Sequence, residues 1–507
     1  MRRGITVAPR FRKDYATKEE VLNIHNAANF ILEHVGVGDV APRLCKTYKD
    51  LGCDVDEEKG VVKIPQALAD EAANKIPGSM VLPARDPKND ILLEAGAGRC
   101  IVGGFGLMST LAEFDPKSRT SIYRDCTRDD MWKYQKLVEY FPEYDETCML
   151  FMPMDLTAEG LPADIHETNS TLQCNTKHMW HIDALDHVEE YAQLAAEILG
   201  GKEELQKRPI ITLHTDTPGM TYGKKTSDRI QGCLDSWAHG IPTLTDFTDV
   251  CFSGFMGPAT IAGSYAVTVA ASVAQAVALA IHHPGRIPTM TYELIMPVDN
   301  YTQESTGVLN QTFDFGEMLN VTYWHNAYNS PKASMYPACS GGGFDNGYGA
   351  DTQSGYGLPN MLRALFAGSD QQGIFPVLAF SVRLEGYAIT AECVRALKRL
   401  VEEKDLTPEA FQSPKWIGRE PRGGFEDDEE TLELLKHFAW SPMDDGYGLL
   451  ERRQYLQWIT DHKTMDDRAW ELTMKIVKEF PNPLPPKDVK ERMDGMVAKW
   501  DEKYKVR

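Results

Sequence analysis

The spacing of hydrophobic positions changes near residue 100. Before it, in residues 17–36, apolar side chains recur three or four positions apart and the segment ends at Gly36. The apolar positions are Val21, Ile24, Ala28, Ile31 and Leu32. This spacing, closed by a glycine, predicts an amphipathic helix. Residues 54–77 predict a short strand or turn followed by another helix.

After residue 100, short apolar runs alternate with helical patterns. The predicted strands are 100–106, 148–154, 177–183, 209–216, 241–247, 287–297, 333–341 and 374–382. The helices predicted between them include 127–141, 187–200, 226–240, 258–283 and 390–403. Eight strands alternating with helices over about 300 residues predict an α/β fold of the (β/α)8 TIM-barrel type. A doubly wound open sheet is the alternative, but no GxGxxG motif follows the first predicted strand.

Three regions follow from this pattern. Residues 1–98 are predicted to be a mainly helical region that packs on the barrel, residues 99–405 the barrel, and residues 406–507 a helical extension. The sequence "PNPLPP" at 481–486 predicts a linker before a last helix. The apolar positions of that helix are Val489, Met493, Met496, Val497 and Trp500. Their helical spacing predicts that it docks on the barrel exterior or on a second subunit. A homo-oligomer is therefore expected.

The composition and net charge argue against some classes of function. A hydrophobic fraction of 42% and a charged fraction of 25% are those of a soluble globular protein. The net charge of −21 opposes binding to nucleic acid or to an anionic membrane. The 10 cysteines form no CxxC pair, which indicates a reducing compartment, and no apolar signal segment is visible near the start. We therefore expect a cytoplasmic protein.

One segment has the length and composition of a membrane span. Residues 258–282 contain no Asp, Glu, Lys or Arg. The segment is nevertheless rich in Ala, Ser and Thr, holds Gln275, and is followed by His-Pro-Gly. These features predict a buried helix that packs closely against its neighbours.

In a barrel of this type, chemistry takes place where strands end and the following loops begin. Aromatic, acidic, histidine and arginine side chains gather at the predicted strand ends. The candidate substrate-binding residues are Phe105, His181, His214, Asp246, Tyr292, Glu293, Phe344, Asp345, Tyr348, Asp351, Phe380 and Arg383.

The loop after the seventh predicted strand, residues 340–357, is rich in glycine. A phosphate cradle is disfavoured there, because the loop has no Lys or Arg and Asp345 and Asp351 would repel an anion. A surface loop whose glycines only form turns is the second interpretation. The third is a floor of carboxylates and rings, including Phe344 and Tyr348, that attracts a quaternary ammonium ion. We favour the third.

Metal binding has weaker support. His178 and His181 are three apart, so on a strand they face opposite sides and cannot share one ion. His214 and Asp216 share a face, and with Asp246 they could form a metal site, a general-base pair or ordinary hydrogen bonds. Cys339 and Glu293 would bind zinc only with a third ligand. No protein-bound metal is expected.

Several motifs together resemble those of the trimethylamine methyltransferase (MttB) superfamily, including members without pyrrolysine such as glycine betaine methyltransferase. The resemblance covers about residues 17–480. It rests on "IHNAANFILEHVGV", "VVKIPQALADEA", "RDPKND", "FDPKSRTSIYRDCTRDDM", "MGPATIAGSYAV" with "HHPGRIP", and "GADTQSGYGLPNMLRALFAG". The last two are the most specific.

The resemblance implies a TIM barrel whose mouth receives a partner corrinoid protein, with methyl transfer from an amine to Co(I) of cobalamin, as in methanogenesis. The family's trimethylamine enzymes carry a pyrrolysine in the region that here reads "DNGYGADTQ", with Gly347 and Tyr348. The resemblance therefore implies a quaternary amine as substrate, such as glycine betaine, proline betaine or carnitine. Arg383 and His214 are candidate donors to a substrate carboxylate. The alternatives are a zinc-dependent methyltransferase using Cys339, and a non-catalytic protein that binds quaternary amines or corrinoid.

Overall fold

The computed structural model describes most of the chain outside residues 298–376. The described residues are 5–6, 8–11, 16–77, 79–94, 99–103, 108–149, 151–182, 185–217, 219–238, 240, 244–287, 293–297, 377–378, 381–402, 406–411, 424–425, 428–438, 446–450 and 454–506. Some residues within helices and strands are described by their backbone alone, among them His181, Asp246 and Glu293.

The predicted N-terminal helix is confirmed. Helix α1 (Lys18–Phe30) continues into a π-helical turn, η2 (Ile31–Val35), and ends at Gly36, whose φ of 80° suits a glycine. Thr17 and Glu20 form a capping box at its start. The rest of this region comprises α2 (Pro42–Asp50), the hairpin β2 (Asp54–Asp56) and β3 (Val61–Lys63), and α3 (Gln66–Lys75).

The centre of the molecule is a parallel sheet. Five strands lie in the order β13-β12-β11-β10-β9, and every neighbouring pair is parallel. They are β9 (Glu146–Cys148), β10 (His178–Ile182), β11 (Ile211–Thr217), β12 (Leu244–Ser253) and β13 (Glu293–Pro297). The fold is therefore a mixed α/β fold with a parallel sheet, as predicted.

A second sheet lies next to β9. Its order is β14-β15-β7-β8, formed by β7 (Thr110–Asp115), β8 (Thr120–Asp125), β14 (Val377–Leu378) and β15 (Ser381–Val382). Strand β15 is parallel to β7, whereas β7 with β8 and β14 with β15 are antiparallel pairs. A parallel bridge between Met108 and Phe151 joins the chain before β7 to the chain after β9.

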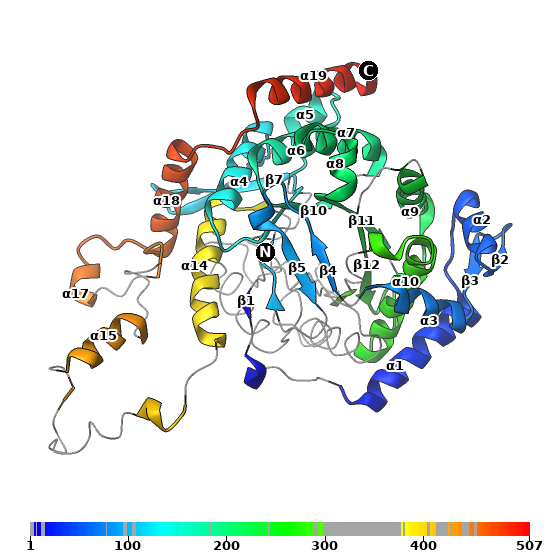
Figure 1. Cartoon of the computed structure of the whole chain (residues 1–507), viewed down its shortest axis with the longest axis horizontal. Coiled ribbons are helices and arrows are strands. Elements are labelled where there is room, and N and C mark those ends of the chain that lie inside the picture. Colours follow the sequence, from blue (N-terminus) through cyan, green and yellow to red (C-terminus); the bar gives the residue numbers. More distant parts are fainter. Residues whose placement is uncertain are drawn as a thin grey trace.

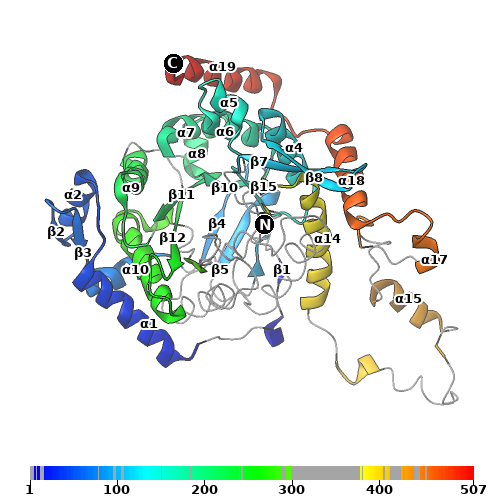
Figure 2. The same ribbon diagram turned by 180° about the vertical axis from the view of Figure 1, so that it is seen from behind.

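Helices lie outside the strands (Figures 1 and 2). They are α4 (Arg128–Tyr140), α5 (Met154–Ala158), α6 (Ala163–Cys174), α7 (Val188–Leu199), α8 (Lys202–Lys207), α9 (Gly223–Ala238), α10 (Ile261–Ala280) and α14 (Leu384–Val401). The apolar helix α10 has the length and composition of a membrane span, but 83% of its apolar window is buried in the fold. The prediction of a buried helix is confirmed.

A hairpin covers the amino ends of the parallel strands. Strands β4 (Ser79–Leu82) and β5 (Ile91–Glu94) form it, and its connecting segment holds "RDPKND". Asp90 in that segment forms an ion pair with Arg208, 2.6 Å away, just before β11. The carbonyl of Pro83 accepts a 2.6 Å hydrogen bond from Nδ1 of His178 at the start of β10. The opposite, carboxyl end of the sheet therefore lies away from this hairpin.

The last part of the chain is helical. It comprises α15 (Glu429–Phe438), α17 (Tyr455–Trp458), α18 (Met465–Glu479) and α19 (Lys487–Tyr504). Helix α19 lies on the outside of α6 and α7 (Figure 1). It buries Met493, Val497 and Trp500. The predicted docking of this helix on the exterior of the α/β region is confirmed.

Three strand predictions need correction. The second predicted strand begins earlier, at Glu146, and residues 101–103 of the first form no strand. The segment 374–382 forms two short antiparallel strands rather than one. The hairpin β7–β8 was not predicted, because β8 is mostly exposed and has no apolar run. The seventh predicted strand, 333–341, lies outside the described residues. The barrel and the three domain boundaries stay predictions.

Candidate functional site

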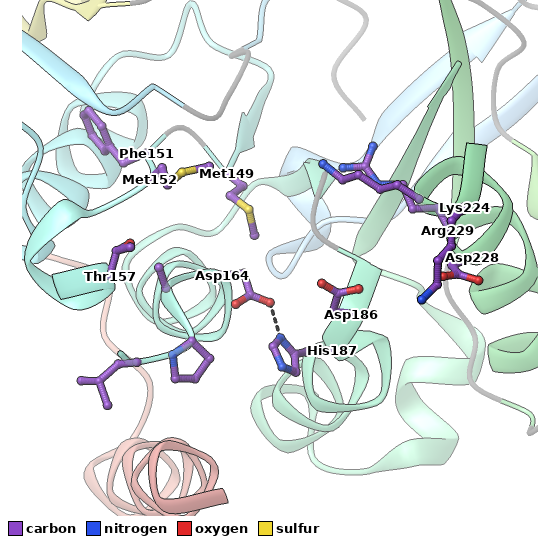
Figure 3. A pocket seen from close by; sticks show the side chains of 14 residues that line it. Met149, Phe151, Met152, Thr157, Asp164, Asp186, His187, Lys224, Asp228 and Arg229 are labelled. Atoms are coloured by element: carbon purple, nitrogen blue, oxygen red, sulfur yellow. Dashed lines mark hydrogen bonds and ion pairs between the residues drawn. The ribbon is translucent and has the colours of Figure 1, made fainter. Parts of the chain in front are cut away.

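A cavity of about 580 Å³ opens at the carboxyl end of the parallel sheet. It lies among the segments that follow three neighbouring strands, β9, β10 and β11 (Figure 3). Its lining residues are Met149, Phe151, Met152, Thr157, Leu161, Pro162, Ala163, Asp164, Asp186, His187, Lys224, Lys225, Asp228 and Arg229. Ligands of α/β proteins bind outside the carboxyl ends of parallel strands, so this cavity is the candidate site in the described part of the chain.

One wall of the cavity is acidic. Asp164 lies in the first turn of α6, and Asp186 and His187 follow β10. Nδ1 of His187 donates a 2.6 Å hydrogen bond to Oδ2 of Asp164, and the hydroxyl of Tyr191 donates to the same oxygen. The carboxylate of Asp164 therefore fixes both the orientation of the imidazole and which ring nitrogen carries the proton.

The surroundings of His187 shift its acidity in opposite directions. Burial lowers the pKa of His187, whereas the hydrogen bond to Asp164 and the negative charges of Asp164, Glu190 and Asp186 raise it. The net result is a pKa above the ordinary value of 6.5. Cationic His187 therefore persists to higher pH than a free histidine.

The opposite wall is basic. Lys224, Lys225 and Arg229 lie in the first two turns of α9, together with Asp228. Both lysines are exposed, and Arg229 is buried. The amino end of a helix adds partial positive charge to this wall. The two walls, with Asp164 and Asp186 on one side and α9 on the other (Figure 3), therefore carry opposite charge.

The base of the cavity is apolar. Met149, Phe151 and Met152 come directly after β9. The amide of Phe151 donates a 2.7 Å hydrogen bond to Oε1 of the buried Glu167 in α6, which fixes this segment. The ring of Phe151 packs edge-on against Tyr134, with 5.9 Å between centroids. Met149 is buried and Met152 is exposed, so the apolar surface extends from the interior to the rim.

The described strands place some of the predicted site residues. His214 of β11 is buried, and its Cα is in register with that of Asp246 on β12, so these two predicted residues are neighbours. Glu293 on β13 is in register with Asp249, three residues further along β12. His181 lies near the carboxyl end of β10.

Arg383 is already engaged. It is fully buried at the start of α14, and its guanidinium lies 3.1 Å from Glu385 and 2.9 Å from Asp466. A substrate carboxylate at Arg383 would compete with both of these carboxylates. The predicted role of Arg383 stays a prediction.

The remaining predicted site residues lie outside the described residues. They are Phe105, Tyr292, Phe344, Asp345, Tyr348, Asp351 and Phe380, together with Cys339 of the zinc alternative. Among the described residues, no group of three or more His, Cys, Asp or Glu side chains could hold a metal ion.

His178 is a structural residue. It is fully buried, donates to Pro83 through Nδ1, and accepts at Nε2 a 2.8 Å hydrogen bond from the Thr212 hydroxyl. Burial lowers its pKa to about 4. The histidine that lines the cavity is His187, which the sequence analysis did not select.

Sequence reasoning also missed the charged residues of the walls. The signal was present, because Asp186 and His187 follow the third predicted strand and Lys224 and Lys225 follow the fourth. These four residues lie several positions beyond the predicted strand ends, so the strand-end rule does not select them.

Comparisons with known proteins agree on one family. The family profile described as trimethylamine methyltransferase (MTTB) matches residues 7–293, more than half of the chain. A trimethylamine methyltransferase MttB2 of Methanosarcina mazei is 24% identical over 506 residues, which covers 96% of this chain and 95% of that protein. A trimethylamine methyltransferase MttB of Desulfitobacterium hafniense is 24% identical, covering 96% of this chain and 94% of its own length. An MttB of Methanosarcina thermophila is 30% identical over 199 residues, covering 39% of this chain and 40% of its own.

Proposed function

The chain belongs to the trimethylamine methyltransferase family and is a methyltransferase, and we propose that its methyl donor is a quaternary amine bearing a carboxylate. Glycine betaine, proline betaine and carnitine are amines of this class. The proposed acceptor is the Co(I) of a corrinoid carried by a partner protein. The proposal includes a (β/α)8 barrel, which is supported by the parallel pairing of β15 with β7 and by the Met108–Phe151 bridge.

The observation that carries the proposal is the opposite charge of the two cavity walls. A betaine has a cationic nitrogen and an anionic carboxylate a few bonds apart. The carboxylate would bind at the amino end of α9, near Lys224 and Lys225. The ammonium group would lie towards Asp186 and the thioethers of Met149 and Met152. The predicted cage of Phe344, Asp345, Tyr348 and Asp351 remains part of the proposal.

In the proposed reaction, the main role of the protein is to position the methyl donor. When the bond between nitrogen and methyl breaks, nitrogen keeps the electron pair and leaves as a neutral tertiary amine, so no proton donor is required. A reduced corrinoid supplies the nucleophile. The residues of the cavity would bind the donor, orient one methyl group towards the acceptor and exclude water. The chain contains only the twenty ordinary residues, so it has no pyrrolysine to activate trimethylamine.

The charge of the α9 wall can be tested with paired donors. We expect Lys224→Ala/Lys225→Ala to raise KM for glycine betaine about tenfold, because a carboxylate loses charge-assisted hydrogen bonds worth about 1.5 kcal/mol. The KM for tetramethylammonium, which has no carboxylate, should stay unchanged. Initial rates with free cob(I)alamin as acceptor give both values.

A matched control removes a positive charge elsewhere. Lys207 is an exposed lysine of α8, at the other end of the sheet from the cavity. Lys207→Ala should leave both KM values unchanged. An equal rise of KM for the two donors in the double variant would remove Lys224 and Lys225 from carboxylate binding.

A further inference from the structure

The last turn of α19 and the residues after it contact the segments that form the acidic wall of the cavity. The amide of Val506 donates a 3.0 Å hydrogen bond to the carbonyl of Gly160, in the connection between α5 and α6. Leu161 and Asp164, just after Gly160, line the cavity. A hydrogen bond between backbone groups therefore connects the residues after α19 to the loop that leads into the acidic wall.

Gly160 is specifically suited to this contact. Its φ is +70°, and a Cβ built at this position would lie 2.6 Å from the carbonyl oxygen of Val506. A larger residue would be strained by the left-handed backbone and would also displace the chain at Val506. The close approach of the Val506 carbonyl therefore leaves no room for a side chain at residue 160, whereas the positive φ of Gly160 belongs to the end of α5.

Side chains of α19 hold the amino ends of α6 and α7 together. The ring of Tyr504 lies 4.4 Å from the ring of His187, centroid to centroid, at an interplanar angle of 56°. The Tyr504 hydroxyl donates to Glu190 in the first turn of α7. Nε2 of His166, in the first turn of α6, lies 2.8 Å from Oδ1 of Asp501. The same turn of α19 thus contacts both helices that carry the acidic wall.

The contact reaches the groups that define the wall. His187 is hydrogen-bonded to Asp164, and Asp164 also accepts a hydrogen bond from Tyr191, so the positions of these three side chains are coupled. Tyr504 packs against the imidazole of His187. Loss of this ring would let His187 change rotamer and would free the Asp164 carboxylate to move.

We propose that Tyr504 is a positioning residue of the cavity, which holds His187 and Asp164 in the orientation that binds the methyl donor. This inference rests on the proposed function, because it takes the cavity to be the donor site. Tyr504 acts through His187 and need not contact the donor itself.

Three substitutions test the proposal. Tyr504→Ala removes the ring, Tyr504→Phe keeps the ring and removes the hydroxyl, and Gly160→Ala displaces the chain at Val506 while keeping Tyr504. We expect Tyr504→Ala and Gly160→Ala each to raise KM for the methyl donor about tenfold with kcat changed less than twofold. Tyr504→Phe should restore most of the affinity, since the ring contact survives.

A second readout needs no activity. In protein with ¹⁵N-labelled histidine, the Nδ1–H of His187 should give a proton signal protected from exchange with water. We expect the signal in the unchanged protein and in Tyr504→Phe, and its loss in Tyr504→Ala and Gly160→Ala. Gly495→Ala is the matched control, because a Cβ at this helical position of α19 meets no described atom within 4 Å. It should change neither readout.

The outcomes separate the two proposals. If the unchanged protein methylates no acceptor from any quaternary amine, the proposed function fails, and the proton signal alone still decides whether Tyr504 orders His187. A Tyr504→Ala protein that keeps both its KM and the His187 signal, and only unfolds at lower temperature, would overturn the inference, because Tyr504 would then only attach α19.

Discussion

At the scale of single residues, two histidines show how the surroundings of an imidazole set its pKa. His178, at the amino end of β10, is fully buried between Pro83 and Thr212, and burial lowers its pKa to about 4. His187, beyond the carboxyl end of the same strand, is also partly buried, but Asp164 raises its pKa. The first is neutral at physiological pH and structural, whereas the second lines the cavity, and its protonated form persists to higher pH than that of a free histidine.

The buried His178 predicts a dependence of stability on pH. The unfolded chain binds a proton at His178 below about 6.5, but the folded chain does so only below about 4, so stability is lost as the pH falls through this window. The loss at full protonation should be roughly 3 kcal/mol. Denaturant unfolding at several pH values between 4 and 7 measures it.

The control is the same measurement on His178→Gln. This variant should be less stable at neutral pH, because the bonds to Pro83 and Thr212 are altered. Its stability should fall less steeply with pH than that of the unchanged protein. Parallel pH profiles for the two proteins would contradict the account of His178.

The candidate site was only partly predictable at this scale. Position at a predicted strand end selects His214 and Asp246, which the register brings together, but β12 continues to Ser253, so Asp246 lies near the amino end of the observed strand. The same rule does not select Asp164. This residue lies in the first turn of α6, which follows the short helix α5 rather than a strand. The pairing of Asp164 with His187 depends on how α6 and α7 pack, and no spacing in the sequence encodes that distance.

At the scale of secondary structure, buried hydrogen bonds between side chains connect helices to strands. The Thr215 hydroxyl of β11 donates a 2.8 Å hydrogen bond to Oε1 of Gln275, which is buried in the apolar helix α10. The amide of Gln275 also donates to Thr217 over 3.4 Å. A polar residue inside an otherwise apolar helix therefore fixes α10 against β11.

Removing this amide should destabilise the protein. Gln275→Leu keeps a similar volume but removes a hydrogen-bond partner of the buried Thr215 hydroxyl. We therefore expect the free energy of unfolding to fall by about 1–3 kcal/mol. Combining it with Thr215→Val should recover part of that loss, because the hydroxyl that loses its hydrogen bond to Gln275 is removed too. Denaturant unfolding of the single and double variants measures the coupling. Strictly additive effects would show that the bond contributes nothing.

Helices were predicted better than strands. The sequence pattern places α4, α7, α9 and α10 close to their observed bounds, because α4, α7 and α9 each have one buried face and α10 is buried along almost all of its length. The prediction joins β14 and β15 into one strand, since the two residues between them, Ala379 and Phe380, are apolar and neither is Gly or Pro. Strand β8 was missed because Ile122 and Tyr123 are exposed and no alternating pattern marks a buried face.

At the scale of the whole molecule, the described strands give the order expected for part of a barrel. Strands β9 to β13 follow one another in parallel, and β15 and β7 are parallel next to the β9 side. The amino ends are covered by the β4–β5 hairpin, and the cavity opens at the carboxyl end. This arrangement supports the proposed reaction, in which donor and acceptor meet at one end of the sheet.

The most direct test is methyl transfer by the purified chain to free cob(I)alamin, with trimethylamine and a series of quaternary amines as donors. We predict that methylcobalamin accumulates with at least one carboxylate-bearing quaternary amine, and that trimethylamine gives none. Accumulation with trimethylamine alone, or tight binding of quaternary amines without methylcobalamin, would contradict the account.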